Sequence, residues 1–379
     1  MRVAVPKETA KGEARVALTP TAVGRLTASG VTVIVEAGAG RDSFPDNLYE
    51  QAKAEIGRGT KATLEGADVV VKVRKPELDE VERLPKGTTL ISFLQPLTSP
   101  DLVRSLAGRH ATSFGLDAIP RITRAQSMDA LSSQATIAGY KAALIAADSL
   151  PRIFPMLMTA AGTLTPAKVL VLGAGVAGLQ AIATCRRLGA VVEAYDVRAA
   201  AAEEVRSLGA RFVELPLETQ EGAGGYAREQ SEEFLRRQRE LLGQHSAQSD
   251  VVITTALIPG RPAPKLLTAA MVEGMKPGTL VVDIAAEAGG NCELTKPGEV
   301  YVHRGVAIHG VVNPAALVPV HASELYAKNI ANLLALLTKD GELRPDWDDD
   351  VVKGCCITRG GEVVHEATRK AMGLATTAA

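Results

Sequence analysis

The feature that most constrains this chain is an apolar segment that runs into a glycine-spaced turn. Residues 168–172 have the length and apolar content of a buried strand, and Gly173, Gly175 and Gly178 follow with GxGxxG spacing. In that spacing the first glycine permits a tight turn, the second lets the backbone approach a pyrophosphate, and the third allows close helix–strand packing. The helix expected over residues 179–188 would point its N-terminal N–H groups at the phosphates. The segment therefore predicts a dinucleotide site at the end of a strand.

A second predicted strand, residues 191–195, leads into Asp196, 18 positions after Gly178. A carboxylate at this position accepts hydrogen bonds from the ribose diol of adenosine and repels a 2′-phosphate, which favours NAD over NADP. Arg198 lies two residues further on, and an arginine there can accommodate a 2′-phosphate, which favours NADP. A glycine turn followed by a solvated Asp is the structural alternative.

Length and charge limit the classes of function. The 379 residues suffice for about two domains, and 46% hydrophobic with 22% charged residues is ordinary for a globular protein. The net charge is −1 without a block of one sign, so we expect no nucleic acid and no anionic membrane surface as a partner. The sequence predicts no membrane span, and its N-terminus leads directly into an expected strand without a signal peptide.

The four cysteines and six histidines show no metal-ligand spacing, so we expect no metal site. The adjacent Cys355 and Cys356 are interpreted as small apolar residues near a strand, with a reactive thiol as the alternative. This cysteine usage is typical of a reduced, cytosolic protein.

Short apolar segments alternate with helical patterns along the chain, which is typical of parallel α/β folds. We expect two doubly wound, Rossmann-like parallel-sheet domains with a cleft between them. The first would be discontinuous, residues 1–130 plus 318–379, and the second, residues 131–317, would bind NAD(H). Expected strands are 3–5, 31–35, 69–73, 90–93, 112–115, 169–172, 191–195, 251–254, 280–284 and 308–311. Expected helices include 20–28 with Thr19 as its cap, 102–106, a long connecting helix over 125–149, and 322–337, while 351–352, 356–358 and 362–364 suggest a terminal hairpin.

Residues 120–134, at the expected start of the connecting helix, are dense in hydrogen-bonding groups. Arg121 is suited to pair with a phosphate or with Asp129, and Gln126 and Ser132 are suited to hold a carboxamide. A polar helix start capped by a serine is the alternative.

Residues 222–227 form a glycine-rich stretch around a single aromatic residue, Tyr226. Glycine allows mobility, so Tyr226 could fold over a ligand as part of a lid. A flexible, exposed loop without function is the alternative.

Together these segments resemble the NAD-binding domain I of proton-translocating nicotinamide nucleotide transhydrogenase, within the alanine dehydrogenase/transhydrogenase superfamily. The resemblance covers nearly the whole chain, from Pro6-Lys7-Glu8 through residues 15–20 to the C-terminal hairpin. Its most specific parts are residues 121–133, 173–178 with Asp196, 224–227, 254–260 and 287–292.

The resemblance implies a role for each matching residue. Around the nicotinamide, where the reacting ring is oriented, it places Arg121, Gln126, Asp129 and Ser132, with Gln126 in reach of the partner domain. Along the rest of the dinucleotide it places Gly173, Gly175, Val176 and Gly178, then Asp196, Val197 and Arg198 at the adenosine end, Gly225 and Tyr226 in a mobile loop, and Gln238 and Leu257 as further contacts.

The family's activity is also implied. Hydride would pass directly between NADH here and NADP⁺ bound by a beta subunit, with no substrate acid or base. Membrane-spanning subunits would translocate the proton, and this chain would be a homodimer in the cytoplasm, held on the cytoplasmic face of the inner membrane by its partner subunits.

Two other classes remain as alternatives. Alanine dehydrogenase resembles the same family, and Arg15 and Lys72 match its pyruvate-binding positions. Its catalytic histidine follows an aromatic–Leu pair, whereas here Phe93-Leu94 precedes Gln95, which cannot shuttle a proton. A non-catalytic NAD sensor is the third class, but it would have no need of a polar segment that presents the nicotinamide.

Overall fold

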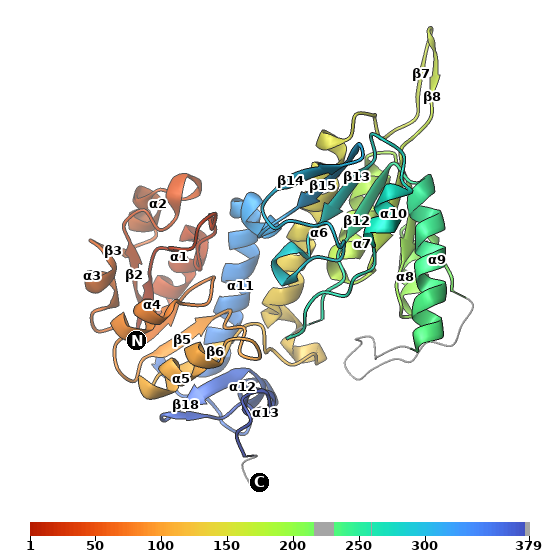
Figure 1. Cartoon of the computed structure of the whole chain (residues 1–379). Coiled ribbons are helices and arrows are strands. Elements are labelled where there is room, and N and C mark those ends of the chain that lie inside the picture. Colours follow the sequence, from red (N-terminus) through yellow and green to blue (C-terminus); the bar gives the residue numbers. More distant parts are fainter. Residues whose placement is uncertain (216–230, 259, 376–379) are drawn as a thin grey trace. The chain divides into compact units, whose positions relative to one another are not determined.

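The computed structural model describes residues 1–215, 231–258 and 260–375 (Figure 1). The chain forms two compact units: unit 1 comprises Met1–Gln134 and Val318–Ala379, and unit 2 comprises Ala135–Leu317. The boundary expected from the sequence was residue 130, where α6 (Ala130–Ser149) begins before it continues into unit 2.

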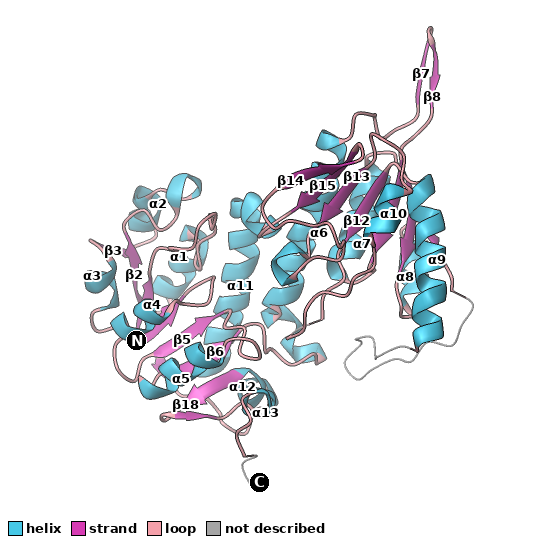
Figure 2. Ribbon diagram, in the orientation of Figure 1, coloured by secondary structure: helices cyan, strands magenta, loops and turns pink. Residues whose placement is uncertain are grey.

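Unit 1 is built on an eight-stranded sheet with the order β19-β18-β6-β5-β4-β1-β2-β3 (Figure 2). Strands β1 to β6 are parallel, whereas β18 pairs antiparallel with β6, and β19 antiparallel with β18. The strands are β1 (Arg2–Val5), β2 (Thr32–Glu36), β3 (Glu55–Gly57), β4 (Val69–Val71), β5 (Thr89–Ser92), β6 (Thr112–Gly115), β18 (Cys356–Arg359) and β19 (Glu362–Val363). The chain winds outward from β1 in one direction and from β4 in the other, so the strand order reverses between these two neighbours.

Helices cover both faces of this sheet, because alternate strand residues point to opposite faces. Val3 and Val5 pack with α1, α11 and α12 in one core, and Ala4 packs with α4 and α5 in the other. The helices of unit 1 are α1 (Pro20–Ala28), α2 (Asp46–Gln51), α3 (Thr60–Leu64), α4 (Leu78–Arg83), α5 (Pro100–Gly108), α11 (Pro319–Leu337), α12 (Asp350–Cys355) and α13 (Glu366–Ala371), with the 3₁₀ helices η1 (Arg41–Ser43) and η2 (Thr123–Met128) and the small hairpin β16 (Thr338–Lys339) and β17 (Glu342–Leu343).

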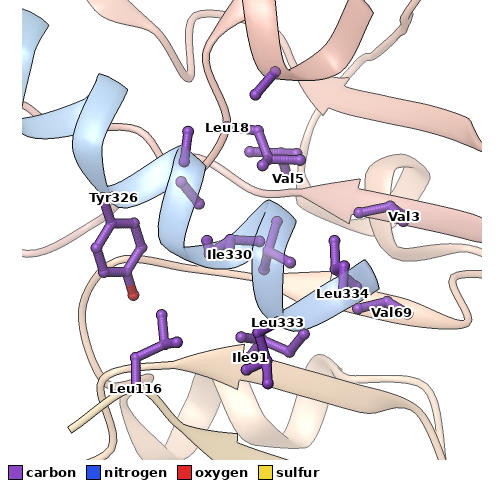
Figure 3. Close-up of a cluster of buried hydrophobic side chains, with 14 of the residues drawn as sticks. Val3, Val5, Leu18, Val69, Ile91, Leu116, Tyr326, Ile330, Leu333 and Leu334 are labelled. Atoms are coloured by element: carbon purple, nitrogen blue, oxygen red, sulfur yellow. The ribbon is translucent and has the colours of Figure 1, made fainter. Parts of the chain in front are cut away.

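Helix α11 joins the C-terminal part of the chain to the core of unit 1. Tyr326, Ile330, Leu333 and Leu337 recur at helical spacing and are fully buried. Figure 3 shows α11 side chains gathered with residues of β1, β4 and β5. Unit 1 is therefore discontinuous in sequence because its two segments share one core.

Unit 2 carries a seven-stranded sheet with the order β11-β10-β9-β12-β13-β15-β14, parallel except for β14. Its strands are β9 (Lys168–Leu172), β10 (Val191–Tyr195), β11 (Arg211–Phe212), β12 (Val251–Thr254), β13 (Leu280–Asp283), β14 (Val300–His303) and β15 (Val306–Gly310). Its further helices are α7 (Val176–Arg187), α8 (Ala201–Ser207), α9 (Glu232–Gln248) and α10 (Ala269–Glu273), with the 3₁₀ helices η4 (Ala286–Ala288) and η5 (Pro314–Leu317). Helices α6, α7 and α8 pack on one face, and α9 and α10 on the other.

A separate hairpin, β7 (Leu157–Thr159) and β8 (Gly162–Leu164), extends away from this sheet (Figure 1). Every residue of its two strands is exposed, including Met158 at 74% and Leu164 at 52%. A two-stranded hairpin has little stability by itself.

The predicted fold class is confirmed, as is the Thr19 cap, whose side chain accepts from Ala22 N–H. Other details were wrong. The connecting helix over 125–149 is two elements, η2 and α6, because Asp129 caps a new helix. Residues 351–352 belong to α12 and not to the hairpin, because Asp349 caps a helix there. Helix α7 begins at 176 and α11 at 319, earlier than expected.

Candidate functional site

The glycine turn of unit 2 lies where the strand order of its sheet reverses. In the chain β9 leads to β10 on one side, while β12 lies on the other side, and open α/β sheets bind ligands at such a point. Gly173 follows β9 with a φ of +98°, which other residues rarely adopt. A Cβ on Gly178 would lie 1.8 Å from the carbonyl oxygen of Gly173, so only glycine lets α7 start this close to the turn. A Cβ on Gly175 would meet no described atom within 4 Å, so the space outside the turn is open.

The N-terminus of α7 faces that open space. Gly175 is the N-cap residue, and Leu179 N–H donates the first helical hydrogen bond to its carbonyl oxygen at 2.8 Å. The N–H groups before Leu179 have no partner within the helix, as at any helix start. The turn therefore offers N–H donors and the positive end of the helix dipole, an arrangement that binds phosphate groups.

Asp196 joins the end of β10 to the glycine turn. Its Oδ2 accepts from Ala174 N–H at 2.7 Å, and its Oδ1 accepts from Arg198 N–H at 2.9 Å. The Arg198 guanidinium also donates to this carboxylate, with Nε 3.0 Å from Oδ1 and Nη2 3.1 Å from Oδ2. The acid expected to bind ribose is thus already bound to two segments of this chain.

Two loops that sequence reasoning left without a role support the turn. Thr255, after β12, donates from Oγ1 to the carbonyl oxygen of Gly173 at 3.0 Å. Asn291 accepts from Ala256 N–H at 2.9 Å and donates to the carbonyl oxygens of Ala256 and Pro264, both at 2.8 Å. Their sequence signal was present, since both lie in segments that carried the family resemblance, but the bond partners are distant in sequence.

Several other predicted contacts lie in unit 2. Val176 is 42% exposed at the start of α7, Leu257 is 49% exposed in the loop after β12, and Val197 is half-buried. Gln238 is buried on α9 and donates from Nε2 to the hydroxyl of Tyr195 at 2.9 Å. Burial raises the pKa of Tyr195 to about 12, so its hydroxyl stays protonated.

The predicted lid falls on a part of the chain without a described structure. The glycine-rich segment with Gly225 and Tyr226 lies outside the described residues. The role of these two residues therefore stays a prediction.

The polar segment of unit 1 forms η2 and the start of α6. Asp129 caps α6: its Oδ1 accepts from Ser132 N–H at 2.9 Å, and its Oδ2 accepts from Ser132 Oγ at 2.6 Å. Arg121 and Gln126 are exposed on the same segment. Asp129 and Ser132 thus bind each other, while the two longer side chains lie at the surface of the unit.

Helix α11 holds this segment in place. The buried Asn329 donates from Nδ2 to the carbonyl oxygen of Ser127 at 2.9 Å and accepts from Ser133 Oγ at 2.7 Å. Gln134 donates to the carbonyl oxygen of Ala322 at 3.0 Å, so bonds from several residues tie the segment to one helix. Sequence reasoning missed Asn329, because nothing local marks a partner about 200 residues away.

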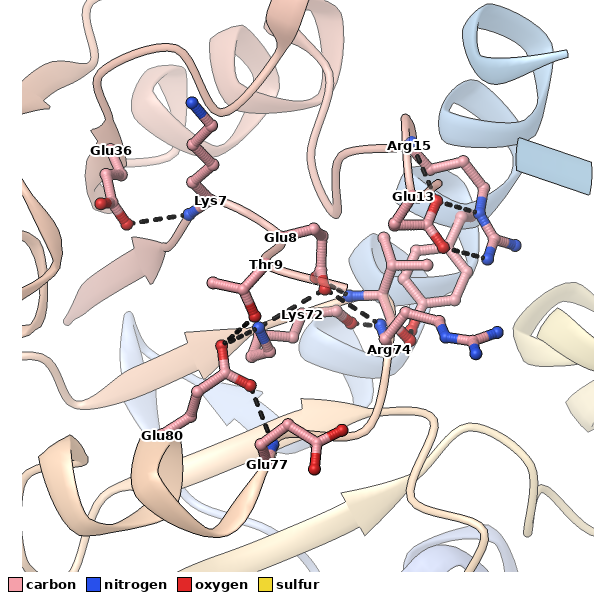
Figure 4. A network of polar contacts seen from close by, with 12 residues as sticks. Lys7, Glu8, Thr9, Glu13, Arg15, Glu36, Lys72, Arg74, Glu77 and Glu80 are labelled. Carbon is pink, nitrogen blue, oxygen red and sulfur yellow. Dashed lines mark hydrogen bonds and ion pairs between the residues drawn. The ribbon is translucent and has the colours of Figure 1, made fainter. Parts of the chain in front are cut away.

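In unit 1, charged residues lie at the point between β1 and β4 where the strand order reverses (Figure 4). Glu8 follows β1 and Lys72 follows β4, and their Oε2 and Nζ atoms lie 3.4 Å apart. Lys72 also lies 2.9 Å from Oε1 of Glu80, and the Arg15 guanidinium pairs with both carboxylate oxygens of Glu13 at 2.8 and 2.7 Å. Burial raises the pKa of Glu8, although Lys72 opposes that rise. We call these five residues the ion network.

Gln95 follows β5 on a strained turn of unit 1. Its φ of +49° is unusual for a residue other than glycine. Asp117 supports the turn by accepting from Gln95 N–H at 2.6 Å and from Leu94 N–H at 3.2 Å. Burial raises the pKa of Asp117.

Sequence comparisons agree with this arrangement. The profile of the alanine dehydrogenase/PNT N-terminal domain matches residues 4–138, and that of the C-terminal domain matches residues 142–366. The first part of NAD(P) transhydrogenase subunit alpha of Rhodospirillum rubrum is 48% identical over 378 residues, which cover 97% of this chain and 98% of that protein. The chain belongs to the alanine dehydrogenase/PNT family. The resemblance seen in the sequence is thereby confirmed.

Solved structures of this family have the same fold. A transhydrogenase from Sinorhizobium meliloti superposes with a TM-score of 0.85 at 45% identity, covering 97% of this alanine dehydrogenase/PNT chain and 100% of that one. An L-alanine dehydrogenase has a TM-score of 0.83 at 26% identity, over 98% of this chain and 99% of that one. Since both activities occur on one fold, the site must decide between them.

Metal-ligating clusters and membrane-spanning helices are both absent from the part of the chain that the structure describes. The described residues contain no group of three or more His, Cys, Asp or Glu that could hold a metal ion. Within the same residues, no helix is long and apolar enough to cross a membrane.

Proposed function

We propose that this chain is the NAD(H)-binding alpha subunit of a proton-translocating transhydrogenase. It would exchange hydride directly between NADH bound here and NADP⁺ bound by a partner beta subunit. The observation that carries the proposal is the glycine turn at the strand reversal of unit 2, with Gly175 facing open space and Asp196 hydrogen-bonded to Ala174.

The residues present fit a dinucleotide. Because residue 175 is glycine, the space beside the N–H groups of α7 is open, and this space suits a pyrophosphate. A side chain at position 175 would occupy it. Asp196 would bind the adenosine ribose, flanked by Val197 and Arg198, and Val176 and Leu257 supply exposed apolar surface for the cofactor. The nucleotide bound here supplies the hydride.

The family resemblance, rather than any placement of the two units, leads us to propose that the polar segment of unit 1 orients the nicotinamide. Arg121 and Gln126 are exposed and carry long side chains that could turn toward a ring carboxamide, while the Asp129–Ser132 pair fixes the backbone from which they project. Direct hydride transfer needs the two rings at about 3–3.5 Å in a fixed orientation and needs no acid or base. The segment would therefore orient one ring and leave its other face to the partner. Gly225, Tyr226 and Gln238 remain proposed contacts by resemblance.

The ion network argues against an alanine dehydrogenase activity. Such an enzyme must bind the carboxylate of a small substrate with a cation. The two candidate cations, Arg15 and Lys72, are buried and paired with this chain's own glutamates. Three carboxylates already face these two cations. A substrate carboxylate would have to displace one of them.

The exposed hairpin supports a homodimer. Met156, Leu157 and Met158 are 60%, 45% and 74% exposed on an element with little stability of its own. A second copy of the chain would cover these side chains. In the proposed complex the chain would lie in the cytoplasm and reach the inner membrane through its partner subunits, as the family resemblance implies.

Hydride exchange tests the proposal. The purified chain is incubated with NADH and an NADP⁺ analogue, with and without the NADP-binding domain of a transhydrogenase. Exchange only with the added domain supports the proposal. NADH binding without exchange in either mixture contradicts it, and oxidation of L-alanine by NAD⁺ would then identify a dehydrogenase.

A further inference from the structure

The Arg198 side chain occupies the atoms that the proposed function assigns to ribose. A carboxylate has about four acceptor positions, two on each oxygen. On Asp196, Ala174 N–H and Arg198 N–H take one position on each oxygen, at 2.7 and 2.9 Å. The Arg198 guanidinium takes the other two, through Nε at 3.0 Å and Nη2 at 3.1 Å. Each acceptor position is therefore filled by this chain itself.

Only the guanidinium bonds can open without disturbing the fold. The bond from Ala174 N–H joins the end of β10 to the glycine turn after β9, so breaking it would move the turn, and the bond from Arg198 N–H shapes the backbone just after β10. The Arg198 side chain, in contrast, is 27% exposed and can swing toward water. Its Nη2 also donates to the carbonyl oxygen of Ala174 at 3.2 Å, which holds it across the turn.

We propose that Arg198 is a specificity-determining residue that competes with the adenosine ribose for Asp196. This inference rests on the proposed function, because it needs a nucleotide in unit 2. The ribose hydroxyls must displace Nε and Nη2 before they can donate to the carboxylate. While the pair is closed, its charges largely cancel, so Asp196 repels a 2′-phosphate less than an unpaired carboxylate would.

Both effects reduce the preference for NAD(H) over NADP(H). Competition weakens NADH binding, and a displaced guanidinium lies next to the position of a 2′-phosphate, where it would attract NADPH. Asp196 and Arg198, which gave opposing signals in the sequence, therefore act as one ion pair. Removing the Arg198 side chain should increase the discrimination against NADP(H) that Asp196 provides.

The test compares dissociation constants of NADH and NADPH for the full chain and its variants. Arg198→Ala should bind NADH roughly tenfold more tightly, with no gain for NADPH, so their ratio rises at least that much. Arg198→Lys keeps the charge but loses the two-pronged contact, and should give a smaller rise. Arg206→Ala is the control, because it removes one positive charge from α8, where Arg206 pairs with Glu214, and should leave the ratio unchanged.

A second ligand separates competition from a general charge effect. An NADH analogue without the adenosine 2′-hydroxyl has one donor fewer for Asp196, so Arg198→Ala should improve its binding less than that of NADH. Weaker or unchanged NADH binding by Arg198→Ala overturns the inference, since Arg198 would then contact the nucleotide or play no part. Wild-type protein that binds no NADH would overturn the proposed function itself, and the inference with it.

Discussion

At the scale of single residues, one polar side chain of the site has two roles. Asp196 is both the proposed ribose acceptor and a structural bond to Ala174 in the glycine turn. A substitution there therefore has two effects, one on nucleotide choice and one on the shape of the turn. Variants that differ in only one of these effects can separate them.

Asp196→Asn should relax the discrimination against NADPH and keep the bond to Ala174, while its NH₂ group replaces the oxygen that accepts from Arg198 N–H. Its amide oxygen can still accept from Ala174 N–H, but the charge that repels a 2′-phosphate is gone. Asp196→Ala loses both, and should also lower the free energy of unfolding by about 1 kcal/mol. Nucleotide titration and urea denaturation of both variants measure this. Unchanged discrimination in both variants would show that other groups set the preference.

Gln126→Asn tests the residue expected to reach the partner domain. The variant keeps the amide but shortens the side chain by one methylene, which changes position more than affinity. Hydride exchange should slow roughly tenfold or more, with little change in NADH affinity. Stopped-flow exchange and NADH titration are compared. Equal losses of rate and affinity would contradict the assignment.

At the scale of elements, α11 stabilises a distant segment. Asn329 fixes the carbonyl oxygen of Ser127 and the hydroxyl of Ser133. Helix propensity and capping rules cannot predict such a contact, because the partners lie 202 and 196 residues apart in the sequence.

Asn329→Ala should loosen the polar segment. It removes both hydrogen bonds that the buried Asn329 makes to this segment, so the free energy of unfolding should fall by about 1–3 kcal/mol, and hydride exchange should slow more than NADH affinity falls. Asn332→Ala is the control, because Asn332 donates to the same Ser127 oxygen at 3.0 Å from an exposed position. Equal effects of the two variants would contradict a special role for Asn329.

The ion network gives unit 1 a pH dependence. Burial raises the pKa of Glu8 above its ordinary value of 4.5, so at pH values between 4.5 and the folded pKa the folded chain holds a proton that the unfolded chain releases. The contribution of Glu8 to stability is therefore complete below pH 4.5 and is lost as the pH rises through its folded pKa.

Glu8→Gln should remove that loss. Its amide oxygen can still accept from Val73 N–H, so the variant should gain stability relative to the wild type as the pH rises above about 4.5. Lys72→Met is the contrasting variant, because it strands Glu8 and Glu80 and should cost about 3–5 kcal/mol at neutral pH. Urea denaturation across pH values from about 4 to about 8 measures both. A stability difference between Glu8→Gln and wild type that falls with pH would contradict the raised pKa of Glu8.

The sequence indicated those parts of the molecule whose cause is local. The GxGxxG turn, the position of Asp196 and the alternation of strands and helices depend on neighbouring residues and were predicted. β3 and β11 are two or three residues long, and β7 and β8 have three residues each, so all four strands are too short for a periodic pattern. The Glu8–Lys72 ion pair and the Asp196–Ala174 bond depend on which strands become neighbours, which no local pattern specifies.

At the scale of the whole molecule, the exposed hairpin predicts self-association. Met158→Ser should weaken the dimer without unfolding the chain, because the side chain is 74% exposed in a single copy. Leu78→Ser, at a 50% exposed apolar residue of α4, is the matched control. Sedimentation over a range of concentrations measures the association. A monomeric wild-type chain would contradict the dimer, and equal effects of the two variants would exclude the hairpin as its interface.

The central claim is that hydride passes directly from the nucleotide held here to one held by a partner. NADH deuterated at the transferable position of its nicotinamide C4 tests this most directly, with this chain, an NADP-binding domain and NADP⁺ in ordinary water. Direct transfer predicts that the deuterium appears in NADPH, that none is lost to solvent, and that no transfer occurs without the partner domain. Deuterium released to water, or transfer by this chain alone, would contradict it.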